Sequence, residues 1–400
     1  IDEIILKLLA KNAEDRYQSM AGLLSDLNLV LDLELSKTQI KKFKPGLQDI
    51  SSRLTISQKL YGRTSEIKIL ETAYQHAIQG EKVLLTLSGQ SGVGKSILCQ
   101  ELYRKISGNK GFFLSGSFDI MDRQTPYLAF GKAFRQFADW LLINSPEVQK
   151  TWAERIRKET KGLGRILFDL APNLELILGN QPELLPLNGF ENQQRLQFAI
   201  NAFIQSIARE DSPLVLFLDD YQWANEASVD LLKSFLSNFS LKHLLIIVAF
   251  RDQTGQIENT LPSALEKIAA STTNQSKTFE LHLEPLQVQD VVHLLCDTLK
   301  VSEENVHEFS ILVHSKTKGN PFSITKLLER LYSQKLLYFD YPNNRWNWNL
   351  HLIYSLNLSD EVVDILLEKI RQLNPEALTL VKIASVFGLE FSINQVGMIS

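Results

Sequence analysis

Hydrophobic residues follow two patterns that alternate along this chain. Short apolar runs predict buried parallel strands, and they lie at residues 84–88, 214–218 and 244–250; two mixed stretches, 111–118 and 278–283, predict two further strands. Elsewhere, apolar residues recur every three or four positions, which is the period of an amphipathic helix, and the main such stretches are 67–79, 125–210 and 323–334. Strands that alternate with helices indicate an α/β fold, a parallel sheet with helices on both faces.

Aromatic side chains at helical spacing mark a face that these helices bury. Tyr127, Phe130, Phe134 and Phe137 fall on one such face. Aromatic residues in this pattern are far more often core than a platform for stacking bases, so we expect them to be structural. After residue 284 the pattern predicts helices and then a hairpin over 336–350. Three helices followed by a hairpin indicate a small winged-helix unit.

Composition narrows the class of protein. The chain has 400 residues, 44% hydrophobic and 22% charged, which suits roughly two to three domains with real cores. A net charge of −4 gives no sign of a nucleic-acid or anionic-membrane partner. Its two cysteines exclude a disulfide framework and fit a reducing compartment. We expect a cytoplasmic protein, because no apolar run is long enough to span a membrane and no signal peptide is present. The chain begins without Met and stops inside an amphipathic pattern, so we expect a piece of a longer protein.

The stretch after the first predicted strand carries the clearest chemistry. It matches the P-loop pattern, Gly-x-x-x-x-Gly-Lys-Ser, in the strand–loop–helix context that this pattern requires. Glycines let the backbone turn tightly and direct its N–H groups at phosphate oxygens, and the helix that follows adds the positive charge of its N-terminus. Lys95 would bind the β- and γ-phosphates, and the Ser96 hydroxyl would bind Mg²⁺. The predicted contacts with ATP are Gly89, Gln90, Ser91, Gly92, Val93, Gly94, Lys95, Ser96 and Ile97.

A second landmark is the pair of carboxylates that follows the strand predicted over 214–218. Ligands of open α/β sheets bind at the carboxyl ends of the strands, so Asp219 and Asp220 should face the nucleotide. Asp219 would hold Mg²⁺, directly or through water. Asp220 would orient or deprotonate the attacking water. The sequence thus predicts ATP hydrolysis, with Lys95 and Asp220 among the catalytic residues.

Three further motifs, together with the P-loop, resemble those of STAND-class signalling ATPases, which are related to AAA+ proteins. One is the entry Gly-Arg-Thr-Ser-Glu at 62–66, ahead of the P-loop. Another is Asp-Asp-Tyr-Gln-Trp-Ala-Asn at 219–225, and the third is Gly-Asn-Pro at 319–321. The resemblance implies an AAA+-like P-loop NTPase sheet followed by a helical lid, with ATP and Mg²⁺ as cofactors.

The resemblance also implies roles for single residues. Gly62 and Arg63 would lie near the adenine. Arg251, at the end of the strand over 244–250, would sense the γ-phosphate and act in catalysis. Pro321 would contact the nucleotide from the lid and couple lid position to the phosphate state. The residues themselves leave local alternatives open. Gly62 and Arg63 could form a turn with a surface charge, Arg251 could be an exposed strand end, and Pro321 could simply start a helix.

The rest of the chain resembles parts of a larger sensor. Residues 1–35 are similar to the last helices of a eukaryotic-type Ser/Thr protein kinase, with Arg16 at the position that closes that domain, and a plain helical hairpin is the alternative. Residues 36–58 are basic and polar, and we expect a linker there. The remaining predicted parts are an ATPase domain at 59–284, a lid with winged helix at 285–355, and a truncated helical domain at 356–400.

This order is similar to that of cyanobacterial-type proteins in which a Ser/Thr kinase precedes the ATPase and sensor and histidine-kinase modules follow it. It implies an ATP-driven regulatory switch that the flanking kinase and sensor domains read, with a nucleotide-dependent oligomer as a further expectation. A winged-helix ATPase acting on nucleic acid is the competing class, but residues 351–400 carry more acidic than basic side chains. The third class of protein that fits the sequence is a scaffold that holds nucleotide without hydrolysing it.

Overall fold

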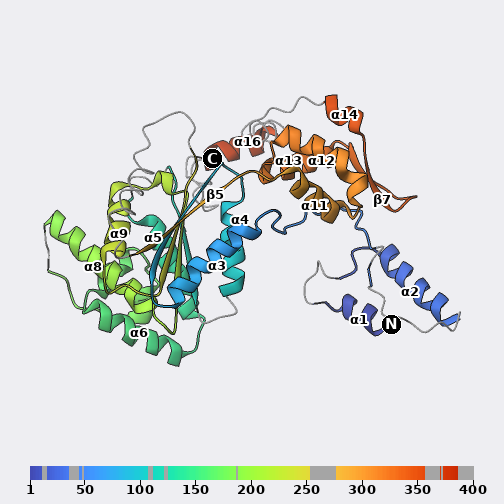
Figure 1. Ribbon diagram of the computed structural model, residues 1–400. Coiled ribbons are helices and arrows are strands. Elements are labelled where there is room, and N and C mark those ends of the chain that lie inside the picture. Colours follow the sequence, from blue (N-terminus) through green and yellow to red (C-terminus); the bar gives the residue numbers. More distant parts are fainter. Residues whose placement is uncertain are drawn as a thin grey trace. The chain divides into compact units, whose positions relative to one another are not determined.

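The structure, a computed structural model, describes residues 1–10, 16–35, 45–46, 49–106, 111–120, 125–185, 188–252, 276–355, 370 and 373–385. It divides into two compact units (Figure 1). Within the described residues, the sheet unit lies in Arg63–Glu284, and the helical unit lies in Ile1–Gly62 and Pro285–Ile383. Most of the domain predicted over 356–400 lies outside the described residues, as do residues 36–44 and 47–48 of the predicted linker. Among the described residues, no helix is both long and apolar enough to cross a bilayer.

The sheet unit is built on five parallel strands, as the sequence predicts. They are β1 (Lys82–Gly89), β2 (Phe112–Ser117), β3 (Leu214–Asp219), β4 (Leu244–Ala249) and β5 (Lys277–Leu283). Their order across the sheet is β2-β3-β4-β1-β5, and every neighbouring pair is parallel. Because all five strands run the same way, the residues that follow β1, β3 and β4 meet at one edge of the sheet.

Helices cover both faces of this sheet, which confirms the predicted α/β class (Figure 1). One face carries α3 (Thr64–Ile78) and α4 (Lys95–Ile106), and the other carries α5 (Leu128–Leu142), α8 (Gly189–Ile207) and α9 (Glu226–Ser237). The smaller helices α6 (Pro146–Thr160) and α7 (Leu174–Leu178) complete the second layer. β3 and β4 are buried along almost their whole length, as a strand covered on both faces must be.

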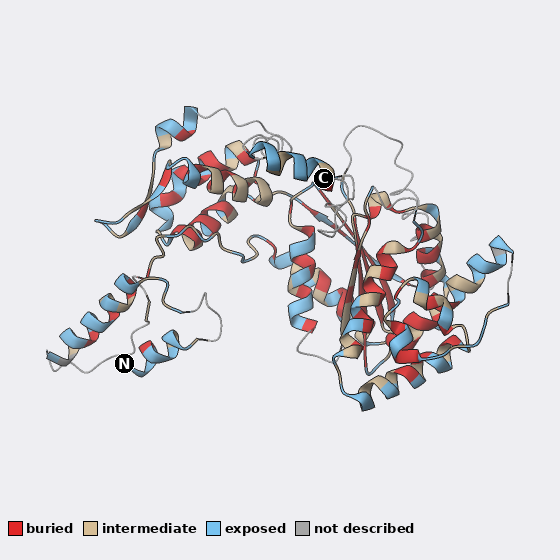
Figure 2. Cartoon of the chain, turned by 180° about the vertical axis from the view of Figure 1, so that it is seen from behind, coloured by how far each residue is buried: buried red, intermediate tan, exposed pale blue. Residues whose placement is uncertain are grey.

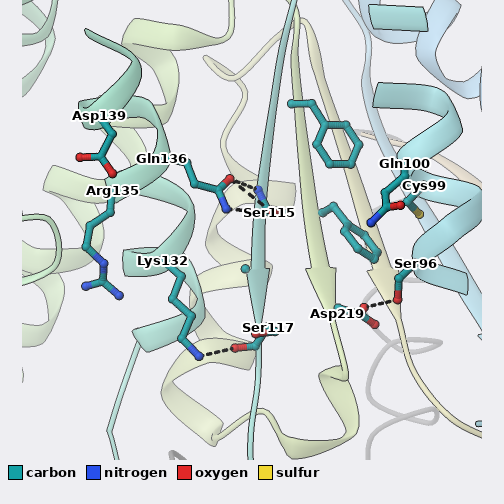
Figure 3. Close-up of a pocket in the computed structure, with 13 residues that line it drawn as sticks. Ser96, Cys99, Gln100, Ser115, Ser117, Lys132, Arg135, Gln136, Asp139 and Asp219 are labelled. Atoms are coloured by element: carbon teal, nitrogen blue, oxygen red, sulfur yellow. Dashed lines mark hydrogen bonds between the residues drawn. The ribbon is translucent and has the colours of Figure 1, made fainter. Parts of the chain in front are cut away.

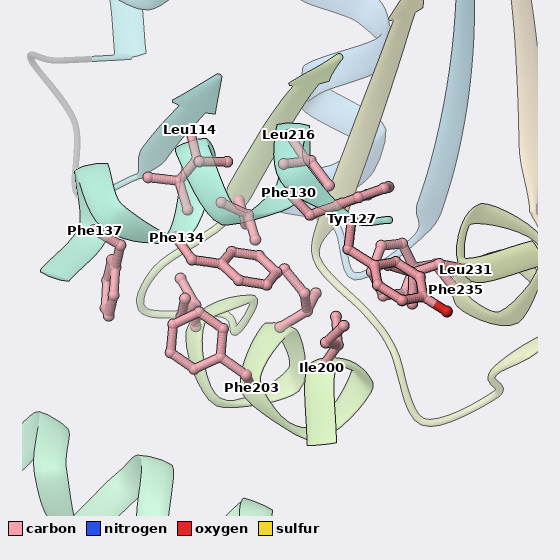
Figure 4. Packing of buried hydrophobic residues seen from close by; sticks show 14 of the residues in the cluster. Leu114, Tyr127, Phe130, Phe134, Phe137, Ile200, Phe203, Leu216, Leu231 and Phe235 are labelled. Carbon is pink, nitrogen blue, oxygen red and sulfur yellow. The ribbon is translucent and has the colours of Figure 1, made fainter. Parts of the chain in front are cut away.

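The predicted aromatic face forms the core between the sheet and α5. Phe130, Phe134 and Phe137 are fully buried there (Figure 4). The ring of Phe134 meets that of Phe203 on α8 at a centroid distance of 4.9 Å and an interplanar angle of 69°. Edge-to-face pairs of this kind add about 0.5–1.5 kcal/mol beyond the area that they bury. The structural interpretation of these aromatic residues is confirmed, and the packing fixes α5 against the sheet.

The helical unit contains the predicted three helices and hairpin. The helices are α11 (Val288–Leu299), α12 (Glu303–Thr317) and α13 (Pro321–Ser333), and the antiparallel strands are β6 (Leu337–Asp340) and β7 (Arg345–Trp348). They are followed by α14 (Leu350–Ser355), and a separate helix, α16, spans Pro375–Ala384. The core includes Phe309, whose ring stacks on that of Trp348 at a centroid distance of 5.0 Å.

Part of the segment predicted as a linker packs on this unit. The Trp346 indole donates to the Ser51 carbonyl at 3.1 Å, and the Ser57 N–H donates to the Thr298 hydroxyl at 3.2 Å. Further towards the N-terminus, α1 (Asp2–Leu8) and α2 (Met20–Leu35) form the predicted helix pair. Much of the surface of α2 is exposed in Figure 2, and its exposed side chains include Leu24, Leu27 and Leu31.

Candidate functional site

The P-loop joins the end of β1 to the start of α4, as its pattern predicts. Lys95 is the first residue of α4, and its ammonium group folds back to donate to the carbonyls of Gly89 at 2.7 Å and Gln90 at 3.0 Å. The side chain is buried, with only 8% of the residue exposed. This burial is the main reason why the pKa of Lys95 is lowered from its usual value. The P-loop therefore holds the buried ammonium group of Lys95 against two of its own backbone carbonyls.

Glycine conformation makes this loop possible. Gly89, Gly92 and Gly94 have φ values of 148°, 76° and 107°, a region that other residues rarely adopt. A Cβ atom at Gly89 would also lie 2.8 Å from the Leu283 carbonyl oxygen, whereas one at Gly94 would meet nothing within 4 Å. Close approach of the backbone of β5 thus explains the first glycine, and the backbone turn alone explains the last.

The first turn of α4 offers backbone donors to a ligand. Its first helical hydrogen bond runs from the Leu98 N–H to the Gly94 carbonyl at 3.0 Å. The N–H groups of Lys95, Ser96 and Ile97 precede that bond and have no partner of this kind within the helix. Such groups at a helix N-terminus bind phosphate, so this turn suits the predicted ATP contacts.

Ser96 and Asp219 meet across the edge of the sheet. The Ser96 hydroxyl donates to Asp219 Oδ2 at 2.6 Å (Figure 3), although the two residues lie 123 positions apart in the chain. The other oxygen of Asp219 accepts from the Asp220 N–H at 2.8 Å. A hydroxyl and a carboxylate suit Mg²⁺, which takes one or two protein oxygens and completes its shell with phosphates and water. Within the described part of the chain, no cluster of three or more His, Cys, Asp or Glu side chains could hold a metal.

Asp220 and Arg251 are brought together at the same edge. Asp220 has φ of 51°, and its Oδ1 accepts from Arg251 Nε at 3.0 Å and from the Gln222 amide at 2.7 Å. The Arg251 N–H in turn donates to Gln222 Oε1 at 3.2 Å. About a third of the Asp220 side chain is exposed (32%), so water can reach it. Gln222 was not among the predicted site residues, although its place in the 219–225 motif was a signal that it belongs there.

Arg63 contacts the P-loop from the start of α3. Its guanidinium donates to the Val93 carbonyl at 3.4 Å and to the Glu284 carbonyl at 2.6 Å, and it forms an ion pair with Glu66 at 3.2 Å. Only 6% of the residue is exposed. The surface-charge alternative for Arg63 is therefore wrong, because the side chain is buried against the loop.

Gly62 and Pro321 belong to the helical unit, apart from the other candidate residues. Gly62 has φ of 63°, and a Cβ atom there would lie 2.4 Å from Asp290 Oδ2. Pro321 is the first residue of α13, whose N-cap is Asn320: its side-chain oxygen accepts from the N–H groups of Phe322 and Ser323 at 3.1 and 3.2 Å. These local contacts account for both residues, and their part in nucleotide binding stays a prediction.

A known family matches the part of the chain that carries this site. Residues 59–247 match the family model described as AAA ATPase domain. The matched segment contains the P-loop, Asp219 and Asp220, and it ends just before Arg251. The expectation of an AAA-type ATPase domain is thereby confirmed for this segment.

One curated relative is similar over the whole chain. Hybrid signal transduction histidine kinase G of Dictyostelium discoideum is 28% identical over 483 residues, which cover 100% of this chain and 14% of the relative. Two solved structures are similar at lower identity. Cdc6p of Pyrobaculum aerophilum has 11% identity and a TM-score of 0.43, over 76% of this chain and 67% of its own. A signal transduction ATPase with numerous domains from Pyrococcus horikoshii, which has a tetratricopeptide repeat sensor, has 13% identity and a TM-score of 0.39, over 86% of this chain and 37% of its own.

Proposed function

We propose that the sheet unit binds ATP with Mg²⁺ and hydrolyses it slowly, as a regulatory switch within a signalling protein. The observation that carries this proposal is the meeting of Ser96 and Asp219 at 2.6 Å beside the buried ammonium of Lys95. Backbone donors for phosphate, a cation and two oxygen ligands for a metal are then present within one loop and one strand end. This combination is what a nucleoside triphosphate with Mg²⁺ requires.

Each residue has a distinct role in this proposal. Lys95 exchanges its bonds with the Gly89 and Gln90 carbonyls for the β- and γ-phosphate oxygens. Ser96 and Asp219 hold Mg²⁺, which neutralises phosphate charge when it is bound. Asp220 accepts a proton from the attacking water, and Arg251 binds the γ-phosphate.

The contacts of Asp220 give a reason for slow turnover. Its Oδ1 accepts from both Arg251 and Gln222, so the carboxylate is oriented, but that oxygen already has two donors and is not open to the attacking water. Arg251 must leave Asp220 for the γ-phosphate before both can act. The same ion pair favours a second candidate function, a scaffold that holds nucleotide without turnover.

The setting of this ATPase is proposed from its relatives. Similarity to a histidine kinase over the whole chain supports a place inside a multidomain signalling protein. We place the chain in the cytoplasm, after a Ser/Thr kinase and before sensor and histidine-kinase modules, with oligomers that depend on nucleotide. The net charge of −4 gives no support to a nucleic-acid partner.

Two substitutions at the end of β3 separate binding from hydrolysis. Asp220→Asn should lower ATP turnover by about 100-fold or more, because a general base contributes that much, and should leave ATP affinity unchanged. Asp219→Asn should instead weaken the Mg²⁺-dependent part of ATP affinity. Asp211→Asn, an exposed carboxylate before the start of β3, is the control and should change neither. Turnover that survives in Asp220→Asn with ATP still bound would show that another carboxylate is the base.

A further inference from the structure

A cavity of about 500 Å³ opens directly beside the proposed metal ligands. Ser96 and Asp219 line one end of it, and the other walls come from β2, α4 and α5 (Figure 3). None of the predicted ATP contacts except Ser96 lies in its lining. The cavity therefore adjoins the position of the γ-phosphate and extends away from it, on the side of β2.

One cation of this cavity is held at a defined place. β2 is an edge strand, and two side chains of α5, one turn apart, bind backbone groups of β2. Gln136 Oε1 accepts from the Ser115 N–H at 2.9 Å, and Lys132 Nζ donates to the Ser117 carbonyl at 3.4 Å. Ser117 is the register partner of Asp219 on β3. The ammonium of Lys132 thus lies at the same edge of the sheet as the proposed metal ligands, one strand further out.

The other charges of the cavity are directed elsewhere. Arg135 Nη1 donates to the Leu170 carbonyl at 3.0 Å, and in Figure 3 its side chain points away from β2. The Asp139 carboxylate accepts from the Asn173 amide at 2.6 Å. Among the described residues at the end beside Ser96, the lining combines the ammonium of Lys132 with the hydroxyl of Ser117, and the carboxylate of Asp219 would be neutralised by its metal.

We propose that this cavity binds inorganic phosphate, the product that leaves the γ position, with Lys132 as its cation. The inference rests on the proposed hydrolysis of ATP. In that reaction water forms a bond to the terminal phosphorus, the bond from this phosphorus to the ADP oxygen breaks, and Asp220 takes one proton of the water and passes it to solvent, which leaves HPO₄²⁻. A doubly charged product then needs a positive group and hydroxyl donors on its way out, and the cavity supplies both. Its volume leaves room for phosphate together with water.

Inhibition of the full chain by its product tests this site. Inorganic phosphate should inhibit ATP hydrolysis, and Lys132→Gln should raise the inhibition constant about tenfold, the effect of losing one charged hydrogen bond. The KM for ATP should stay unchanged, because Lys132 lies outside the P-loop. Lys132→Arg should restore most of the inhibition, and Arg104→Gln, which removes an exposed charge from α4, should act like the wild type. Equal melting temperatures of the variants exclude misfolding.

Binding of labelled phosphate separates this inference from the function on which it rests. In equilibrium dialysis with Mg²⁺ and ADP, the wild type should retain phosphate and Lys132→Gln should lose it. Retention equal in both proteins, or hydrolysis that phosphate does not inhibit, would overturn the phosphate site and leave the ATPase proposal standing. Absence of any ATP binding or hydrolysis would overturn the ATPase proposal itself.

Discussion

At the scale of single residues, the proposed catalytic role of Arg251 requires that ATP change the contact between Arg251 and Asp220. Arg251 Nε donates to Asp220 Oδ1 at 3.0 Å, and both side chains are partly exposed. An arginine in this position stabilises charge on a transferring phosphoryl group. The role that we propose for Arg251 therefore depends on exchanging the Asp220 carboxylate for the γ-phosphate.

Arg251→Met should lower ATP turnover by about tenfold or more, because a charge-stabilising donor is lost. ADP affinity should stay the same, since ADP has no γ-phosphate. Single-turnover hydrolysis and ADP titration measure the two effects, with Arg345→Met in the hairpin of the helical unit as the control. A variant that hydrolyses ATP faster than the wild type would mean that Arg251 only restrains Asp220.

Sequence reasoning reached some of these residue contacts and missed others for a physical reason. The P-loop and the two carboxylates could be predicted because each consists of neighbouring residues in the sequence, and the pattern of those residues is typical of one kind of chemistry. The bonds of Arg63 to the carbonyls of Val93 and Glu284 span 30 and 221 positions, and no spacing predicts which backbone oxygen a buried guanidinium will meet. Lys132 was missed because the spacing of apolar residues in its helix predicts which face is buried and says nothing about the contacts of the polar side chains.

At the scale of elements, the strands were predictable but their order was not. The apolar runs of β1, β3 and β4 identify buried strands by themselves, whereas nothing in the sequence shows that β4 separates β1 from β3. That order matters for the site. It brings the Arg251 that follows β4 between the P-loop and Asp220, and it leaves β2 at the edge, where α5 must bind its exposed backbone.

The junction between β1 and the P-loop should be sensitive to one added methyl group. Gly89→Ala would combine φ of 148° with a contact of 2.8 Å to the Leu283 carbonyl oxygen, a strain of about 1–3 kcal/mol. We expect a lower melting temperature and weaker ATP binding. Gly189→Ala, where a Cβ atom meets nothing within 4 Å, is the control and should change neither. An unchanged melting temperature in Gly89→Ala would show that the loop relaxes freely and that the glycine is not required by packing.

At the scale of the whole molecule, the open question is whether nucleotide state reaches the helical unit. Pro321 begins α13 in that unit, and the resemblance implies that it senses the nucleotide. A ligand shifts an equilibrium only through different affinities for its two states. A proline that merely starts a helix affects stability alone, whereas a nucleotide sensor affects how ADP and ATP are distinguished.

Pro321→Ala should therefore bring the affinities for ADP and ATP closer to each other. Loss of stability should be small, on the order of 1 kcal/mol, because the Asn320 cap remains. Nucleotide titrations and thermal unfolding of the same variant measure both quantities. A lower melting temperature with an unchanged affinity ratio would leave Pro321 as a helix start.

The central claim, that this chain binds ATP through the P-loop, is tested most directly by titrating a fluorescent ATP analogue with and without Mg²⁺ into wild type and Lys95→Ala. The control is Lys105→Ala, which removes an exposed lysine from the same helix. The account predicts Mg²⁺-dependent binding in the wild type and the control and its loss in Lys95→Ala. Equal affinity in a folded Lys95→Ala protein would contradict the account, because the buried cation of the loop would then have no part in holding the phosphates.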